Sequence, residues 1–441
     1  METKLARIAE LAKARPQEKF TSLAHLLSKE MLEKSHRSLE SGKAPGVDEI
    51  GKAEYEANLQ ANLEDLVGRL KRKAYRPQPV KRVYIPKAGT NKKRPLGIPA
   101  YEDKIIQYAL KEILSRVYEA DFLDCSCGFR PQRGCHDALQ LLNEILTTKQ
   151  VNYIVDADIK GFFDHVDHEW MMKFLGQRIA DPSIHHIIRR LLKAGCMEQG
   201  RWQEVEEGTP QGGVISPLLA NVYLHYSVDL WFEKVVRRRL KGEAYMVRYA
   251  DDIVFCFQYE TEAKWFYEEL KMRLGKFNLE VAEEKTKIIR FGRYAESNAK
   301  EETGGKPDTF DFLGFTHYCG QSQTGKFRVK RKTSRKKIKA SLARMKEWLK
   351  ANRVIPIWDL VDKLRSKMRG YYQYYGITDN IFSLDRYAYK VRMLLFKWMN
   401  RRSQKRSFTW EKFNKFLDKC ALPKPRIRVS IFKRRPHIGY I

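Results

Sequence analysis

The stretch that most constrains the fold is Tyr245–Phe257, in which two β-prone runs flank the acidic pair Asp251 and Asp252. Val, Ile, Phe and Tyr on both sides of so short a break predict a β-hairpin. Adjacent carboxylates repel each other and cost free energy when desolvated, so such a pair is stable where water or a cation neutralises it. An isolated Asp-Asp pair is usually a solvated turn, but the apolar flanks argue against an ordinary surface turn here.

A third carboxylate ends a second predicted strand. The run Asn152–Asp158 predicts a strand that ends in Asp158, after which the chain turns through Gly161 into a helix near Asp167–Leu175. Hard oxygen ligands from two strand ends suit Mg²⁺, with Mn²⁺ as an alternative, and two such ions can clamp the attacking and leaving oxygens of a phosphoryl transfer. The pattern therefore predicts a two-metal site of the kind used by template-directed polymerases.

The charge of the chain indicates its partners. Its 441 residues suggest several domains, and a net charge of +30 is tolerated when a polyanion is the usual partner. A membrane surface is the rival partner, but the basic residues are spread over several segments. No apolar run is long enough to span a bilayer, and the N-terminus lacks a secretory signal. We therefore expect a cytoplasmic protein that binds nucleic acid and no membrane.

The seven cysteines do not form a disulfide framework, because their number is odd and their spacing irregular. Cys125, Cys127, Cys135 and His136 could suggest a zinc site. However, Cys-x-Cys is not the usual Cys-x₂-Cys loop. We expect these thiols to be buried or incidental.

Seven motifs resemble one known family, in order and over nearly the whole chain. Tyr-Ala-Asp-Asp at 249–252 resembles the catalytic box of reverse transcriptases, and the motifs around it resemble group II intron reverse transcriptase/maturases. The six further motifs are Gly42–Asp48, Lys92–Tyr101, Gly128–Ala138, Gly208–Asn221, Glu280–Ile288 and Phe312–Phe315.

The resemblance implies an α+β right-hand polymerase with fingers and palm, followed by an α-helical thumb or maturase domain. The implied parts are an N-terminal helical extension (1–40), fingers (41–150), a palm with part of the fingers (151–320), a helical thumb/maturase domain (321–408) and a short basic C-terminal segment (409–441). The tail from Pro423 shows no paired zinc-type cysteines and no His-Asn-His cluster. We therefore do not expect the endonuclease domain that some relatives carry.

The resemblance also implies residue roles at the catalytic centre. Asp158, Asp251 and Asp252 are the implied catalytic and metal-binding carboxylates, with Ile159 as a further metal contact. The implied contacts of the incoming nucleotide are Lys87, Arg94, Phe163, Gln211 and Lys285. Phe163 matches the family's sugar gate by its spacing from Asp158, although Phe162 stays open as the alternative.

The segment after Gly320 is strongly basic: between Lys326 and Lys350 the only acid is Glu347. It resembles a helical bundle packed along a nucleic-acid duplex. We interpret the tyrosines of Gly370–Gly376 mostly as bundle core, with stacking on RNA as the alternative. The candidate nucleic-acid contacts of the whole chain are Arg130, Arg133, Lys330, Arg331, Lys336, Lys337, Arg401 and Arg402.

The implied function is RNA-directed DNA polymerisation, which copies an RNA template into cDNA from a DNA primer and dNTPs with two metal ions. The resemblance also implies a maturase that binds group II intron RNA, aids splicing and retrohoming, and meets target DNA. Two alternatives stay open. One is a reverse transcriptase of the same fold in a CRISPR-associated, diversity-generating or DNA-repair role, and the other is a mainly RNA-binding splicing cofactor.

Overall fold

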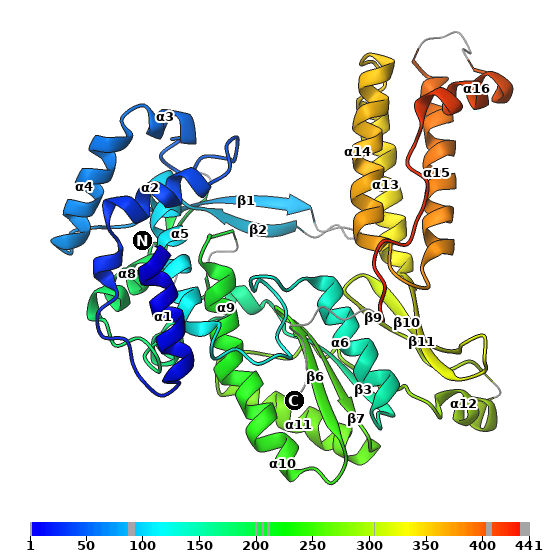
Figure 1. Cartoon of the computed structure of the whole chain (residues 1–441), viewed down its shortest axis with the longest axis horizontal. Helices are drawn as coiled ribbons and strands as arrows, with labels where there is room; N and C mark the ends of the chain where they lie inside the picture. Colours follow the sequence, from blue (N-terminus) through cyan, green and yellow to red (C-terminus); the bar gives the residue numbers. More distant parts are fainter. Residues whose placement is uncertain are drawn as a thin grey trace.

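The computed structural model describes residues 2–86, 93–198, 201–204, 207–209, 212–303, 305–402 and 408–432. The chain begins with helices that pack on the long, buried helix α5 (Figure 1). Apolar residues at helical spacing, such as Leu5, Ile8 and Ala12, form the buried side of the first helix. These helices are α1 (Glu2–Ala14), α2 (Lys29–Ser38), α3 (Lys52–Glu56), α4 (Leu59–Lys71) and α5 (Tyr101–Tyr118), with a 3₁₀ turn at Ala24–Leu26.

A four-stranded sheet extends from these helices in the order β2-β1-β4-β5. Its long antiparallel hairpin, β1–β2, places Ile85 opposite Arg94 and projects toward the C-terminal helices (Figure 1). The strands are β1 (Val80–Pro86), β2 (Lys93–Ile98), β4 (Cys196–Glu198) and β5 (Arg201–Gln203).

A second sheet, in the antiparallel order β6-β7-β3-β8, forms the centre of the molecule. Side chains of alternate residues enter two different cores, one shared with α9 and α11 and the other with α6. The strands are β3 (Tyr153–Asp158), β6 (Ala244–Tyr249), β7 (Asp252–Phe257) and β8 (Lys287–Arg290). The predicted strand ending in Asp158 and the predicted hairpin are both confirmed.

The helices that follow along the chain are α6 (Cys135–Thr148), α7 (His168–Leu175), α8 (Pro182–Leu192), α9 (Ser216–Leu224), α10 (Arg237–Arg239), α11 (Glu260–Gly275) and α12 (Ala295–Thr303). Of these, α8 lies beside the N-terminal helices and α12 lies near the small sheet described below (Figure 1). The helix that starts as α9 continues through two π-helical turns, His225–Asp229 and Phe232–Val236. Asp167 caps α7 by accepting a hydrogen bond from the amide of Trp170 at 2.7 Å, so the predicted helix start is confirmed.

A small sheet, in the order β11-β10-β9, connects the centre to a helical bundle. The elements are β9 (Phe310–Phe312), β10 (Phe315–Gln321), β11 (Phe327–Thr333), α13 (Arg335–Ala351), α14 (Ile357–Tyr375), α15 (Ile381–Met399) and α16 (Trp410–Cys420). Tyr371 and Tyr372 are buried in the bundle, where Tyr371 stacks on Tyr387 with 3.6 Å between ring centroids. The interpretation of these two tyrosines as core is confirmed.

Helix α16 lies in the segment for which the sequence predicted only a short basic tail. It forms because Phe413 and its neighbours pack on α15. The chain then returns along the bundle, where Val429 bridges to Ile377 and Ile431 enters the core beneath α6. This part of the tail therefore joins the bundle to the central sheet.

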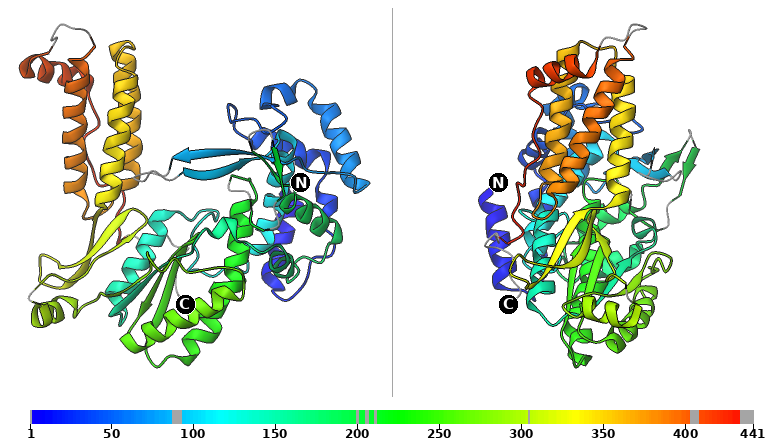
Figure 2. Two further views of the ribbon diagram at one scale, coloured as in Figure 1. Left: turned by 180° about the vertical axis from the view of Figure 1, so that it is seen from behind. Right: turned by 90° about the vertical axis from the view of Figure 1, so that its right-hand side faces the viewer.

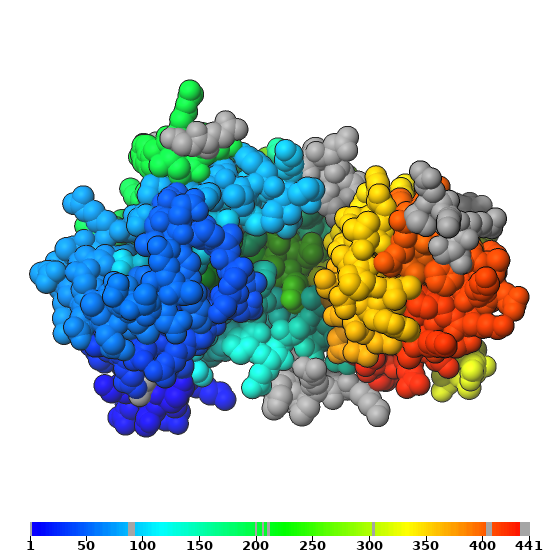
Figure 3. All heavy atoms as spheres, turned by 90° about the horizontal axis from the view of Figure 1, so that it is seen from above, coloured from blue at the N-terminus to red at the C-terminus, as the bar shows by residue number. Residues whose placement is uncertain are grey.

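The bundle and the N-terminal part stand on opposite sides of the central sheet. Viewed from above, the green central part lies at the bottom of a cleft between the blue and the yellow-to-orange parts (Figure 3). Among the described residues, no helix has both the length and the apolar character needed to cross a membrane.

Candidate active site

The tip of the β6–β7 hairpin carries Asp251 and Asp252. Tyr249 pairs with Asp252 across the hairpin, so Ala250 and Asp251 form its two-residue loop. Ala250 has φ = 56°, a left-handed conformation that strains an alanine and that hairpin turns of this length require at their first loop position. This turn places Asp251 in the loop and Asp252 at the start of β7.

Asp158 meets this tip through the pairing of β3 with β7. In that register Asp158 lies directly opposite Asp252, and Ala157 lies opposite Ile253. Directly opposed residues of an antiparallel pair point to the same face and lie within reach of each other. The fold thus brings together the three carboxylates that the sequence predicted as a site.

The carboxylates perturb each other. Burial raises the pKa of Asp251, and the negative charge of Asp158 raises it further. The pKa of Asp252 is raised to about 6, first by desolvation and then by the charges of Asp251 and Asp158. Asp156, two residues before Asp158 on the same face of β3, has a pKa raised to about 7 by burial and by its acidic neighbours. The sequence analysis overlooked Asp156, although the alternation Asp-Ala-Asp places both carboxylates on one face.

The cluster holds one cation of its own: the Lys285 ammonium donates a hydrogen bond to Oδ2 of Asp158. Within the described residues, no group of three or more acidic, histidine or cysteine side chains lies close enough together to hold a metal ion. The donor set nevertheless fits divalent cations, because it consists of hard carboxylate oxygens that repel one another. Ile159, the further predicted metal contact, is paired with Val281 in an antiparallel bridge. The Asp158 carbonyl accepts the hydrogen bond of this bridge from the amide of Ala282, so the Ile159 carbonyl points away from Val281.

A buried network supports the hairpin tip, and the sequence analysis missed it. The guanidinium of Arg248, on β6, donates to both carboxylate oxygens of Asp229 at 2.8 and 2.5 Å, and both side chains are fully buried. Arg248 also donates to Oδ1 of Asn221 at 3.0 Å and to the carbonyl of Ala250 at 3.1 Å. Asn221 in turn donates to the carbonyl of Gly128 at 2.7 Å.

The π-helical turn His225–Asp229 supplies the acid of this network. Gly128 packs so closely on the tip that an added Cβ would lie 2.3 Å from the amide nitrogen of Ala250. Arg248 stands near the end of an otherwise apolar strand, and this was the signal in the sequence for the network. A buried arginine needs a carboxylate partner, so such a position predicts an acidic residue packed against it.

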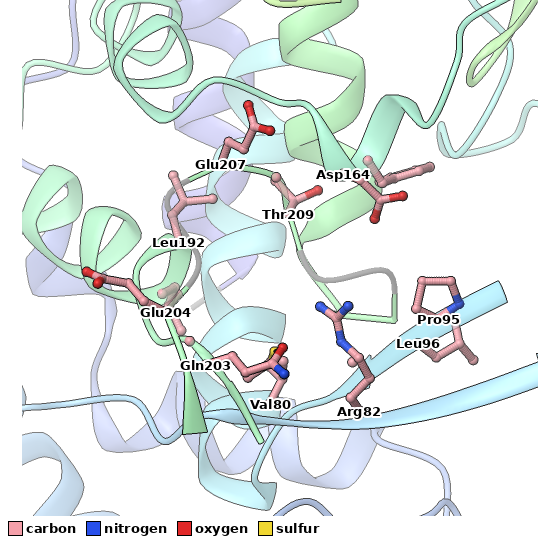
Figure 4. A pocket seen from close by; sticks show the side chains of 16 residues that line it. Val80, Arg82, Pro95, Leu96, Asp164, Leu192, Gln203, Glu204, Glu207 and Thr209 are labelled. Atoms are coloured by element: carbon pink, nitrogen blue, oxygen red, sulfur yellow. The ribbon is translucent and has the colours of Figure 1, made fainter. Parts of the chain in front are cut away.

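Phe162 and Phe163 occupy different environments. Phe162 is buried in the core, whereas Phe163 is half-buried and lines a pocket of about 390 Å³. Arg82, from β1, reaches into this pocket opposite Asp164 and Thr209 (Figure 4). The amide of Thr209 donates to the carbonyl of Phe163 at 2.7 Å, which ties the loop to the turn that carries Phe163. The sequence analysis did not consider Arg82. Its place on a predicted strand was the one feature that could have indicated a role in this pocket.

The predicted phosphate contacts are only partly described. Arg94 is exposed on β2, and its positive charge lowers the pKa of both Asp251 and Asp252. Lys87 and Gln211 lie outside the described residues. Lys285 is exposed and pairs with Asp158, as described above.

Three predicted nucleic-acid contacts are instead engaged within the protein. Arg130 is buried and binds the Glu119 carboxylate and two backbone carbonyls. Arg133 pairs with Asp124 at 2.5 Å. Arg331 is fully buried, donates to Oδ1 of Asn143 at 2.6 Å, and has its pKa lowered to about 10 by burial. The prediction is wrong for Arg130 and Arg331, because a buried guanidinium cannot contact a phosphate, and Arg133 is used in the fold.

The other predicted cations of the C-terminal part are accessible, except for Arg402. Lys336 and Lys337 are exposed at the start of α13, and Lys330 is half-buried on β11. Arg401 is exposed after α15, whereas Arg402 donates to the carbonyl of Ile355 at 2.7 Å. Cys125 and Cys127 are buried, and Cys135 is half-buried.

Comparison with known proteins agrees with this geometry. Residues 85–317 match the family model described as reverse transcriptase (RNA-dependent DNA polymerase). The chain therefore belongs to the reverse transcriptase family, and it is an RNA-directed DNA polymerase.

Its relatives place it among the group II intron proteins of that family. It is 29% identical to the group II intron-encoded protein LtrA of Lactococcus lactis, over 87% of this chain and 75% of that protein. It is 32% identical to protein YkfC of Escherichia coli, over 66% of this chain and 80% of that protein. A putative COX1/OXI3 intron 1 protein of Saccharomyces cerevisiae is 30% identical over 38% of this chain and 20% of its own length.

Proposed function

We propose that the chain extends a DNA primer on an RNA template at the meeting point of β3 and the β6–β7 hairpin. The observation that carries this proposal is the convergence of Asp158, Asp251 and Asp252 at adjacent strand ends of the central sheet. Their mutual repulsion favours the binding of cations between them.

Two divalent ions, Mg²⁺ or Mn²⁺, would supply charge neutralisation for the triphosphate and activation of the primer hydroxyl. Asp158 and Asp251 would hold them, with Asp252 and the Ile159 carbonyl nearby. Lys285 would have to release Asp158 at that moment, and its ammonium would then be free to bind a nucleotide phosphate. The guanidinium of Arg94 suits the same phosphates because it can bind two oxygens at once.

The half-buried position of Phe163 supports its role as the sugar gate. Its ring lies on the side of the turn that faces the pocket, whereas Phe162 is held in the core. A ring beneath the ribose would clash with a 2′-hydroxyl group and so select deoxyribonucleotides.

The helical bundle is proposed to act as the thumb. The positive charge of Lys337, on the first turn of α13, lowers the pKa of Asp252, so α13 begins close to the catalytic carboxylates. A template–primer duplex in the cleft would then lie between the β1–β2 hairpin and the bundle (Figure 1). Lys336 and Lys337 would contact its phosphates.

The catalytic assignment is tested with Asp251→Asn, a change that keeps the size of the side chain. Primer extension should fall by at least about a hundredfold, because several kcal/mol of transition-state stabilisation depend on the ions. Affinity for the template–primer, measured by fluorescence anisotropy, should change little. Asp418→Asn, which removes an exposed carboxylate on α16, is the control. Extension by Asp251→Asn within tenfold of the parent would contradict the assignment.

A second activity, maturase assistance of intron splicing with later insertion into target DNA, is favoured by the similarity to LtrA. Arg401 and Arg402 follow the last long helix of the bundle and are candidates for docking intron RNA; the neighbouring Lys405 and Arg406 lie outside the described residues. Arg401→Gln/Arg402→Gln should weaken binding of a structured intron RNA and spare extension on a generic template. Equal losses in both assays would favour a polymerase without this activity.

A further inference from the structure

A basic pocket of about 680 Å³ lies at the base of the bundle, between α13 and α15 and next to β10 and β11. Its floor is apolar, formed by Ile338 and Leu342, and no carboxylate lines it. Its walls carry five cations: Lys332, Arg335, Lys339, Arg386 and Lys390.

These five cations are not neutralised within the described part of the chain. All five side chains are exposed, and none of them forms an ion pair with a described carboxylate. Five like charges around one pocket repel each other, and such an arrangement is stabilised by a polyanion that brings several negative charges at once. The charge of the pocket therefore suits a phosphodiester chain.

Exposed aromatic rings accompany the cations on α15. Phe382 is 84% exposed and directly precedes the pocket residue Ser383, about one turn before Arg386, whereas Tyr389 lines a separate pocket with Asn414 and Lys424. Aromatic rings beside a basic groove are typical of proteins that stack the bases of single strands. Of the three hydroxyls in the pocket wall, Thr316 donates to the Asp311 carboxylate and Thr333 accepts from the Asn380 amide. Ser383 can bond the 2′-hydroxyl group that distinguishes RNA from DNA.

The pocket faces away from the catalytic carboxylates. Lys337 packs near Gly314 and its charge reaches Asp252, so this flank of α13 faces the catalytic centre. Arg335 and Lys339 are each two residues from Lys337, which is about 200° around a helix. They therefore lie on the opposite flank. In the right-hand view of Figure 2, α13 and α15 stand on the side of the molecule that is turned away from the N-terminal helices.

We propose that this pocket binds a single-stranded segment of RNA that is separate from the template–primer duplex. Four or five nucleotides match its cations, with a base stacked on Phe382. The proposal deepens the RNA-docking activity proposed above by assigning it a surface, and it does not depend on the catalytic assignment. Binding to the pocket and extension of a primer can therefore fail separately.

The test uses a fluorescein-labelled rU12 oligonucleotide and the full chain saturated with an RNA–DNA template–primer. The variant Lys339→Gln/Arg386→Gln/Lys390→Gln should bind rU12 at least tenfold more weakly. Its log–log dependence on salt should be shallower by about 2, because each phosphate contact to a single strand contributes about 0.7. Extension of the bound primer should stay within twofold of the parent. The control Lys412→Gln/Lys419→Gln/Lys424→Gln removes three exposed charges on α16 and the segment after it, and should bind rU12 as the parent does.

A second variant keeps every charge. Phe382→Ala should weaken rU12 binding by roughly five- to 150-fold, the value of one stacked base, without changing the salt dependence. The proposal is overturned if the control loses as much affinity as the pocket variant, or if saturation with template–primer abolishes rU12 binding. It is also overturned if dT12 binds as tightly as rU12, or if the pocket variant loses extension in parallel with rU12 binding.

Discussion

Replacing Asp229 with alanine should destabilise the protein by about 3–5 kcal/mol, because it leaves the Arg248 guanidinium buried without its counter-charge. Both side chains are fully buried, and the pair is joined by two hydrogen bonds at 2.8 and 2.5 Å. At about 2–4 °C per kcal/mol for a unit of 150–250 residues, the thermal midpoint should fall by at least about 6 °C.

The double variant Arg248→Met/Asp229→Leu tests the reasoning more sharply. It removes both charges and fills the space with apolar atoms, so it should be clearly more stable than Asp229→Ala alone. It should still extend primers poorly, since the carbonyl of Ala250 at the hairpin tip loses its donor. Differential scanning fluorimetry and single-turnover extension measure the two effects separately.

The matched control is Glu411→Gln, which breaks the exposed pair with Lys415 on α16. An exposed i,i+4 pair contributes only about 0.3–0.5 kcal/mol, so this variant should be nearly unchanged. The argument fails if Asp229→Ala costs no more than Glu411→Gln. It also fails if the double variant is as unstable as Asp229→Ala, because the unpaired charge would then not be the cause.

Two further predictions concern the gate and the acid response. Phe163→Val should raise incorporation of ribonucleotides relative to deoxyribonucleotides, whereas Phe162→Val should mainly lower the thermal midpoint; the reverse pattern would place the gate at Phe162. His317 is buried on β10, and desolvation followed by the charge of Arg331 lowers its pKa to about 3. Since its folded pKa lies below the unfolded value near 6.5, its contribution to stability is present above pH 6.5 and is lost as the pH falls, by about 2 kcal/mol at pH 5. His317→Phe should therefore lose less stability than the parent between pH 7 and pH 5, and equal acid sensitivity in urea unfolding would contradict this.

The order of motifs along the chain was sufficient to predict the family and the local elements of its catalytic centre. The apolar flanks of Asp251 and Asp252 predicted the hairpin, and the run ending in Asp158 predicted the neighbouring strand; both are observed. These predictions succeeded because hairpins and strand ends depend on residues that are close in sequence. The two adjacent tyrosines Tyr371 and Tyr372 were also interpreted correctly as core, since they follow the apolar period of α14.

The roles of individual arginines were decided by the tertiary structure. Arg130 and Arg248 lie in or beside motifs of the family and Arg331 lies in the basic segment after Gly320, but each is buried against acceptors far away in sequence or on another element. The sequence around a basic residue does not show whether a distant carboxylate or carbonyl will pack against its side chain in the folded protein. The same holds for the pocket between α13 and α15, whose five cations come from three segments that only the packing of the bundle on β11 brings together. Local pattern was enough to predict the strand and the hairpin that carry Asp158, Asp251 and Asp252, because these elements depend on neighbouring residues. Which arginines are buried in the core followed only from the three-dimensional contacts.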